Sequence, residues 1–130
     1  MAIDYSTLAL PKGSTKLDRA IANKAARLTD AKRLRIWAQQ VKDRDQWKDR
    51  KTGATVRRTR TLDPDRAEAH HVVSKDDPAV RYDVRNGICL SMRTHLEVTL
   101  GRYRIEGTVF FRIGGARYID ATYPVTFVRT

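Results

Sequence analysis

Two of the three histidines in the chain, His70 and His71, are adjacent in the segment RAEAHHVV. This segment predicts a β-strand over residues 67–73, in which neighbouring side chains point to opposite faces. One imidazole can therefore bind a ligand on one face while the other serves a different chemical task. Histidine can act as a metal ligand or as a general base, because its ordinary pKa of roughly 6.5 lies near working pH.

The third histidine, His95, and Asn86 follow the pair at defined intervals. Asn86 lies 15 residues after His71 and 9 residues before His95. All three histidines therefore fall within one strand–turn–strand–helix unit of about 35 residues. The elements predicted there are a short extended piece over Val80–Arg85, a tight turn at Asn86-Gly87, an apolar strand at residues 88–90, an N-cap at Ser91, and a helix over Met92–Leu100 stopped by Gly101.

The order His-His, Asn, His at these intervals resembles the HNH nucleases of the ββα-metal fold. The matching stretches read AEAHHVVSK and DVRNGICLSMRTH, and the resemblance covers residues 66–101, with a weaker likeness over 37–60. It implies an α+β fold with a ββα-metal (His-Me finger) motif. It also implies a metal-dependent endonuclease that hydrolyses DNA phosphodiester bonds, nicking or cutting with weak sequence preference and leaving 5′-phosphate and 3′-hydroxyl ends.

The resemblance assigns a role to each of these residues. His70 and His95 are implied to bind one divalent metal ion, and His71 to act as the general base that takes a proton from water. Asn86 is implied to tie its loop to the His71 strand and so to orient the base. With only two imidazole ligands, Mg²⁺ or Mn²⁺ is the expected ion, although two histidines also attract Ni²⁺ or Zn²⁺.

The chain departs from the family at the positions of a structural zinc. Many HNH proteins hold that zinc with two Cys-x-x-Cys pairs, but Cys89 is the single cysteine here, so no structural zinc is expected. The places of the two pairs are taken by Asp49, Thr52, Ser91 and Thr94. Thr99 stands where toxin-type relatives add a third helical histidine. Packing by C-terminal strands is expected to stabilise the motif instead, with a core formed by Phe110, Phe111, Ile113, Tyr118, Ile119, Val125 and Phe127.

A net charge of +11 favours a polyanionic partner, with double-stranded DNA as the expected one. Residues 1–66 carry 17 lysines and arginines against 8 acidic residues, a net charge of +9, so the excess precedes the histidine pair. Acidic membranes fit less well, because no apolar face accompanies the charge. Whether the chain forms a homodimer is left open. The cations nearest the site in sequence, expected to contact DNA phosphates, are Arg66, Lys75, Arg85 and Arg93.

The other elements complete a single expected nuclease domain over residues 1–130. Apolar residues at helical spacing predict a helix from residue 14 to 28, capped by Ser14 or Thr15, and a second stripe to residue 45. Thr29-Asp30 either caps a second helix or lies within one continuous helix. The expected parts are an irregular lead (1–15), a basic helical region (16–61) with extended residues 55–61, the ββα-metal core (62–101), and a β extension (102–130) with a hairpin turn at Gly114-Gly115 and a third, edge strand after Pro124.

The N-terminal segment MAIDYSTLALPKG lacks the features of a secretory signal, so the expected compartment is the cytoplasm of a bacterium or of a phage-infected host. No apolar run reaches membrane-spanning length. Two alternatives stay open beside the DNA nuclease: a non-catalytic DNA-binding module with a degenerate ββα-metal fold, and an RNA-cleaving or toxin-type nuclease with an inhibitor partner. The presence of His71 counts against the first, because a purely structural unit needs no general base.

Overall fold

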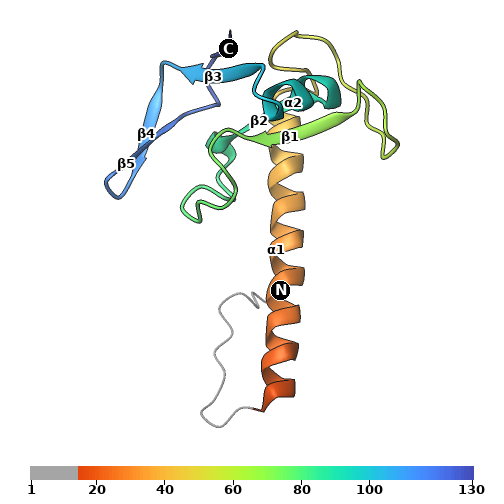
Figure 1. The fold of residues 1–130 in the computed structure, drawn as a ribbon, viewed down its shortest axis with the longest axis vertical. Coiled ribbons are helices and arrows are strands. Elements are labelled where there is room, and N and C mark those ends of the chain that lie inside the picture. Colours follow the sequence, from red (N-terminus) through yellow and green to blue (C-terminus); the bar gives the residue numbers. More distant parts are fainter. Residues whose placement is uncertain (1–14) are drawn as a thin grey trace. The chain divides into compact units, whose positions relative to one another are not determined.

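The computed structural model describes residues 15–130 of the chain. These residues form a mixed α+β fold, as expected, and the chain divides into two compact units between Ile36 and Trp37. The elements in order are α1 (Lys16–Arg44), β1 (Ala67–His71), the 3₁₀ helix η2 (Val84–Asn86), β2 (Gly87–Ser91), α2 (Met92–Thr99), β3 (Tyr103–Gly107), β4 (Phe110–Ile113), β5 (Ala116–Ile119) and β6 (Val125–Arg129) (Figure 1).

Helix α1 starts with a reciprocal cap and runs without a break. The backbone N–H of Asp18 donates to Thr15 Oγ1, and the N–H of Thr15 donates to the Asp18 carboxylate, both at 3.1 Å. Thr29 lies inside the helix, where its hydroxyl donates to the carbonyl of Ala25 at 3.1 Å. Of the two alternatives at Thr29-Asp30, the continuous helix is therefore correct, and Thr15 is a cap. Ser14, the other candidate cap, lies outside the described residues.

The predicted end of the helical stripe near residue 45 is confirmed, because α1 ends at Arg44. Gln46 and Trp47 adopt left-handed backbone angles, with φ of 56° and 54°, which turn the chain out of the helix. Residues 55–61 were expected to be extended. Thr55 and Arg57 each form an isolated β-bridge with a single residue, and residues 55–61 contain no strand.

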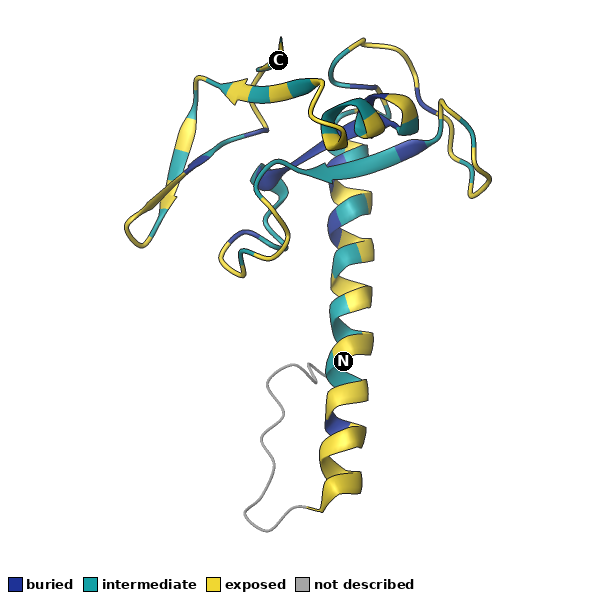
Figure 2. Ribbon diagram, viewed as in Figure 1, coloured by how far each residue is buried: buried dark blue, intermediate teal, exposed yellow. Residues whose placement is uncertain are grey.

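Strands β1 and β2 form an antiparallel pair in which His70 lies opposite Ile88 and His71 opposite Gly87. Helix α2 follows β2 directly and contacts both strands. All five residues of β2 are buried, and Figure 2 shows this strand in the interior of its unit. One apolar cluster contains Ile88, Leu90 and Ala121, and a second contains Val56, Ala67 and Cys89. Because side chains alternate along β2, residues 88 and 90 serve one face and residue 89 the other.

The predicted tight turn at Asn86-Gly87 and the extended piece over Val80–Arg85 are both wrong. Residues 78–82 form turns, and Asn86 ends the 3₁₀ helix, whose N-cap Asp83 accepts a hydrogen bond from the N–H of Arg85 at 2.9 Å. Gly87 has an extended φ of −132°, so it is not required for a turn. A Cβ at this position would lie 2.5 Å from side-chain atoms of Trp37 and Val41. Gly87 is required because α1 approaches the start of β2 closely.

The C-terminal strands form two separate antiparallel pairs, β3 with β6 and β4 with β5. The hairpin turn at Gly114-Gly115 is confirmed, with φ of 60° at Gly114. The expected core is confirmed in part. Tyr118 is buried, and Val125 and Phe127 pack on the Ile88–Leu90 cluster, whereas Phe110 is exposed. Phe111, Ile113 and Ile119 are half-buried, because a two-stranded ribbon has little apolar surface to pack against.

The close approach at Gly87 predicts that Gly87→Ala lowers the free energy of unfolding by about 1–3 kcal/mol, because the added methyl group overpacks Trp37 and Val41. Chemical denaturation measures this change. Gly115→Ala is the matched control, since a Cβ there meets no atom within 4 Å. Equal stability of the two variants would contradict the close approach.

Candidate functional site

The structure brings His70 of β1 and His95 of α2 together. Their ring centroids are 5.0 Å apart, with the ring planes inclined at 66°. The start of α2 sets the position of His95. Ser91 Oγ accepts from the N–H of Thr94 at 3.2 Å and so caps the helix, as predicted, which places His95 one turn in. The two imidazoles therefore converge from the end of a strand and the first turn of a helix.

The environment of His70 favours the neutral ring. Burial lowers the pKa of His70 to about 4, and the neighbouring His95 and His71 add to this shift. A neutral imidazole keeps a lone pair on one nitrogen, which is the form that binds a metal ion. Two such donors suit a divalent cation that takes its other ligands from water or a substrate. Within residues 15–130, no group of three or more His, Cys, Asp or Glu side chains is arranged to hold a metal ion.

Glu68 is beside the histidine pair, on the same face of β1 as His70. Its Oε1 lies 3.6 Å from His95 Nδ1, and its Oε2 lies 3.4 Å from Arg66 Nη2. The carboxylate therefore bridges a histidine and an arginine. Both partners in the contact with Arg66 are partly exposed.

His71 is held on the other face of β1 by two contacts. Its ring stacks on Trp37, with centroids 3.8 Å apart and planes inclined at 11°. Its Nε2 lies 2.9 Å from the carbonyl oxygen of Arg81. Since a carbonyl can only accept, Nε2 carries the proton, and in the neutral ring Nδ1 carries the lone pair. Nδ1 is therefore the atom that can take a proton.

The pKa of His71 is lowered. Burial is the largest cause, the hydrogen bond to the Arg81 carbonyl opposes it, and the positive charges of Arg81 and Lys75 lower the pKa further. A lowered pKa keeps the ring neutral near pH 7, as a base requires. Sequence reasoning missed Arg81 and the stacking role of Trp37. No spacing rule could have identified Arg81, because it acts through its backbone in an irregular loop.

Asn86 is fully buried and closes the loop that begins after β1. Its Oδ1 accepts from the N–H of Val73 at 2.8 Å, and its Nδ2 donates to the carbonyls of Val73 at 2.9 Å and Val80 at 3.3 Å. The N–H of Val72 also donates to the Asn86 carbonyl at 3.0 Å. One side chain thus fixes the chain directly after His71 and the segment that leads to Arg81.

The four cations expected to contact DNA lie in different surroundings. Lys75 and Arg93 are exposed. Arg85 pairs with Asp83 at 2.8 Å and lies over the Phe111 ring at 3.8 Å from its centroid. Arg66 is the one that contacts the histidine pair through Glu68. The structure therefore brings Arg66 to the site, and the charge of Lys75 acts on His71. Arg85 lies in a separate ion pair.

Of the four positions that the resemblance matches to zinc cysteines, Thr52, Ser91 and Thr94 surround the fourth, the buried carboxylate of Asp49. Asp49 is 1% exposed, and its carboxylate accepts from the backbone N–H groups of Ser91 at 2.9 Å and Thr52 at 3.1 Å. Thr94 also donates to it, and Ser91 Oγ lies 3.1 Å from Thr94 Oγ1. Burial alone would raise the pKa of Asp49, but the hydrogen bonds from Thr94, Ser91 and Thr52 outweigh burial and lower it. A hydrogen-bonded carboxylate thus joins these positions.

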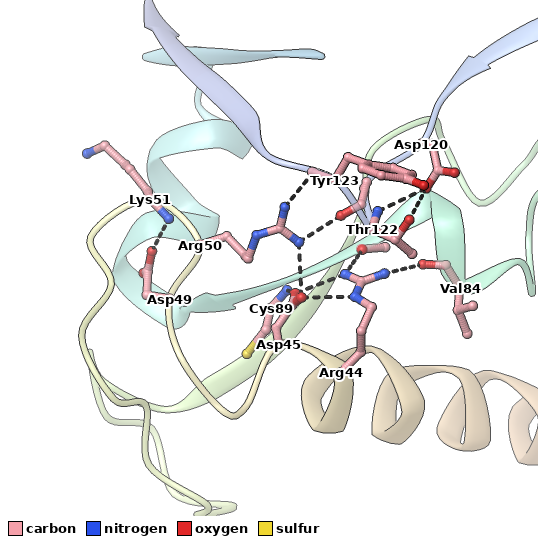
Figure 3. A network of polar contacts seen from close by, with 12 residues as sticks. Arg44, Asp45, Asp49, Arg50, Lys51, Val84, Cys89, Asp120, Thr122 and Tyr123 are labelled. Atoms are coloured by element: carbon pink, nitrogen blue, oxygen red, sulfur yellow. Dashed lines mark hydrogen bonds and ion pairs between the residues drawn. The ribbon is translucent and has the colours of Figure 1, made fainter. Parts of the chain in front are cut away.

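A second buried carboxylate, Asp45, joins the end of α1 to β2 and to the C-terminal segment (Figure 3). Arg44 and Arg50 both pair with Asp45, at 2.9 and 3.0 Å, and the N–H of Cys89 donates to it at 2.8 Å. Arg44 also donates to the carbonyls of Val84 and Gly87 at 2.6 and 2.5 Å. Arg50 donates to those of Ala121 and Tyr123 at 2.7 and 2.8 Å. The expected packing is therefore supplemented by two buried polar networks.

A comparison with models of known protein families finds no match, and comparisons with curated proteins and with solved structures find none either. Within residues 15–130, neither helix combines the length and the apolar character that crossing a membrane requires.

The Asp49 network predicts that Asp49→Asn lowers the free energy of unfolding by about 1–3 kcal/mol, because the amide nitrogen faces backbone N–H donors. Because the pKa of Asp49 is lowered in the folded state, the stabilisation by its carboxylate is present above the ordinary value of 3.8 and is lost as pH falls below it. Denaturation of variant and wild type at neutral and acidic pH measures both effects. The exposed Asp76→Asn is the control, and a similar loss in it would contradict the assignment.

Proposed function

We propose that the protein is a metal-dependent endonuclease of the HNH type that hydrolyses phosphodiester bonds of double-stranded DNA. The proposal depends on one observation: His70 and His95 converge with ring centroids 5.0 Å apart, while the adjacent His71 has a proton-accepting nitrogen on the other face of the strand. The strand–strand–helix order β1–β2–α2 is the arrangement that a ββα-metal motif requires.

In this proposal His70 and His95 hold one divalent cation, Mg²⁺ or Mn²⁺, with Ni²⁺ or Zn²⁺ as alternative ions for two imidazoles. The cation, when bound, supplies positive charge to the phosphate oxygens and to the leaving 3′-oxygen. Glu68 Oε1 lies 3.6 Å from His95 Nδ1, on the side of the ring where a carboxylate commonly orients a ligating histidine. The lowered pKa of His70 supports the ligand role, because protons compete less for its nitrogen.

His71 acts as the general base in this mechanism. Its Nδ1 takes a proton from a water molecule, and the resulting hydroxide attacks phosphorus in line. The P–O3′ bond breaks and the 3′-oxygen takes a proton from solvent, which leaves 5′-phosphate and 3′-hydroxyl ends. The Arg81 carbonyl fixes the tautomer and stabilises the protonated ring that forms. Asn86 is a positioning residue, because it holds the chain on both sides of the His71–Arg81 contact.

The convergence of Asp49, Thr52, Ser91 and Thr94 supports the HNH assignment independently of the histidines. These positions were matched to the family's zinc cysteines by spacing alone, and in the structure Thr52, Ser91 and Thr94 donate to the carboxylate of Asp49. The positive charge of the chain supports DNA as the substrate. Cleavage of RNA in place of DNA would favour the RNA-cleaving alternative, and DNA binding without cleavage would favour the non-catalytic binding module.

The proposal predicts that purified protein nicks or linearises plasmid DNA with Mg²⁺ or Mn²⁺ and that EDTA abolishes cleavage. Removing the base in His71→Ala should lower the cleavage rate by roughly 10²–10⁴-fold. Gel analysis of supercoiled plasmid measures the rate, with an RNA substrate in parallel. Arg112→Ala, an exposed substitution on β4, is the control and should keep most activity. Full activity of His71→Ala would remove His71 from the base role, and cleavage of RNA alone would change the substrate.

A further inference from the structure

A hollow of about 220 Å³ lies beside the start of β1, away from the histidine pair. Four of its lining residues are cations, and no carboxylate of residues 15–130 belongs to its lining. Two carboxylates contact lining residues from outside: Asp63 pairs with Arg57 at 2.6 Å, and Asp43 accepts from Trp47 Nε1 at 2.9 Å. The lining residues are Lys42, Trp47, Arg57, Arg58, Thr59, Arg60 and Ala67. The hollow therefore has the charge that an anionic ligand requires.

Trp47 forms the floor that positions two of these cations. The Arg58 guanidinium lies 4.0 Å from the Trp47 ring centroid, and Lys42 Nζ lies 5.5 Å from it. Stacking uses the flat face of a guanidinium and leaves its N–H edge available for a phosphate, so Arg58 is ordered before it binds. Trp47 itself packs on the apolar cluster of Val56, Ala67 and Cys89, which fixes the floor.

The loop Arg57–Arg60 is tied directly to the strand that carries His70 and His71. The N–H of Ala67 donates to the carbonyl of Arg57 at 2.9 Å, and Arg66 Nη1 donates to the carbonyl of Arg60 at 3.3 Å. Arg66 in turn pairs with Glu68, which contacts His95. A contiguous set of contacts thus leads from the hollow to the histidine pair.

The three arginines of the loop differ in their partners. Arg57 pairs with Asp63 at 2.6 Å, so its charge is already neutralised. Arg58 contacts the neutral ring of Trp47. Arg60 is exposed, and it contacts Arg66 through its backbone carbonyl and not through its side chain. Arg58 and Arg60 are therefore the cations that an external anion would meet.

We infer that the Arg57–Arg60 loop binds the phosphodiester backbone of duplex DNA and guides the strand toward the histidine pair. This inference rests on the proposed function, because it takes DNA as the partner of the same site. Trp47 is covered by Arg58, so the surface contacts phosphates and does not stack bases. Such contacts position the duplex and carry no sequence preference.

The test is the salt dependence of DNA binding in EDTA, where no cleavage occurs. Anisotropy of a labelled duplex is measured over a series of KCl concentrations for the wild type and for Arg58→Ala/Arg60→Ala. The slope of log K against log salt is negative, and losing two phosphate contacts should make it less negative by about 1.8. Binding at 0.1 M salt should weaken by roughly 10–60-fold. Both side chains are exposed, so circular dichroism should show an unchanged fold.

The control is Arg112→Ala/Arg117→Ala, which removes the same charge from an exposed pair on β4 and β5. An unchanged slope in the Arg58/Arg60 variant, or an equal loss in the control, would overturn the inference. The inference would also be overturned if the Arg58/Arg60 variant bound double-stranded RNA of the same sequence more weakly but bound the DNA duplex as the wild type does. Because binding is measured without metal, this test is separate from the test of the proposed function. If the slope changes as expected but the protein does not cleave DNA, only the nuclease proposal is refuted. If the protein cleaves DNA but the slope does not change, only the role of the Arg57–Arg60 loop is refuted.

Discussion

The Asp49 carboxylate is the contact on which the geometry of the site depends. It accepts hydrogen bonds from the backbone of Ser91 and the side chain of Thr94, the two residues that define the start of α2. His95 follows Thr94, so its position relative to His70 is set by where this helix begins. A buried carboxylate without partners would be strongly destabilising, and the partners here are the very groups that fix the helix. The stability of the β1–β2–α2 unit and the geometry of the histidine pair therefore have the same physical origin.

A similar relation holds on the other face of β1. The end of α1 contributes Trp37, which stacks on His71, while Arg44 binds the carbonyls of Val84 and Gly87. Gly87 permits this approach, because any side chain there would collide with Trp37. The helix thus both supports β2 and restricts the His71 ring. His71 and the His70–His95 pair have different neighbours: Trp37 and the Arg81 carbonyl hold His71, whereas Glu68 lies beside His95.

Local features of this fold could be predicted from the sequence, and long-range ones could not. Capping chemistry at Thr15 and Ser91 and the glycine turn at 114–115 identified element boundaries, because these signals act within a few residues. The spacing of His71, Asn86 and His95 identified residues that the structure brings to one unit. The prediction of a turn at Asn86-Gly87 was wrong. The glycine is needed because Trp37, about 50 residues earlier in the chain, packs closely against it. The Asp45 network and the Arg81 carbonyl likewise join segments with no shared local pattern.

The most direct measurement for the central claim is anomalous X-ray diffraction from crystals of the full chain grown with MnCl₂. The account predicts one manganese peak between the rings of His70 and His95, with one nitrogen of each ring at roughly 2.0–2.4 Å and none of His71 coordinated. It also predicts that the peak disappears in His95→Ala while the β1–β2–α2 unit stays folded. A peak elsewhere on the chain, or none at saturating manganese, would contradict the assignment of this pair as the metal site.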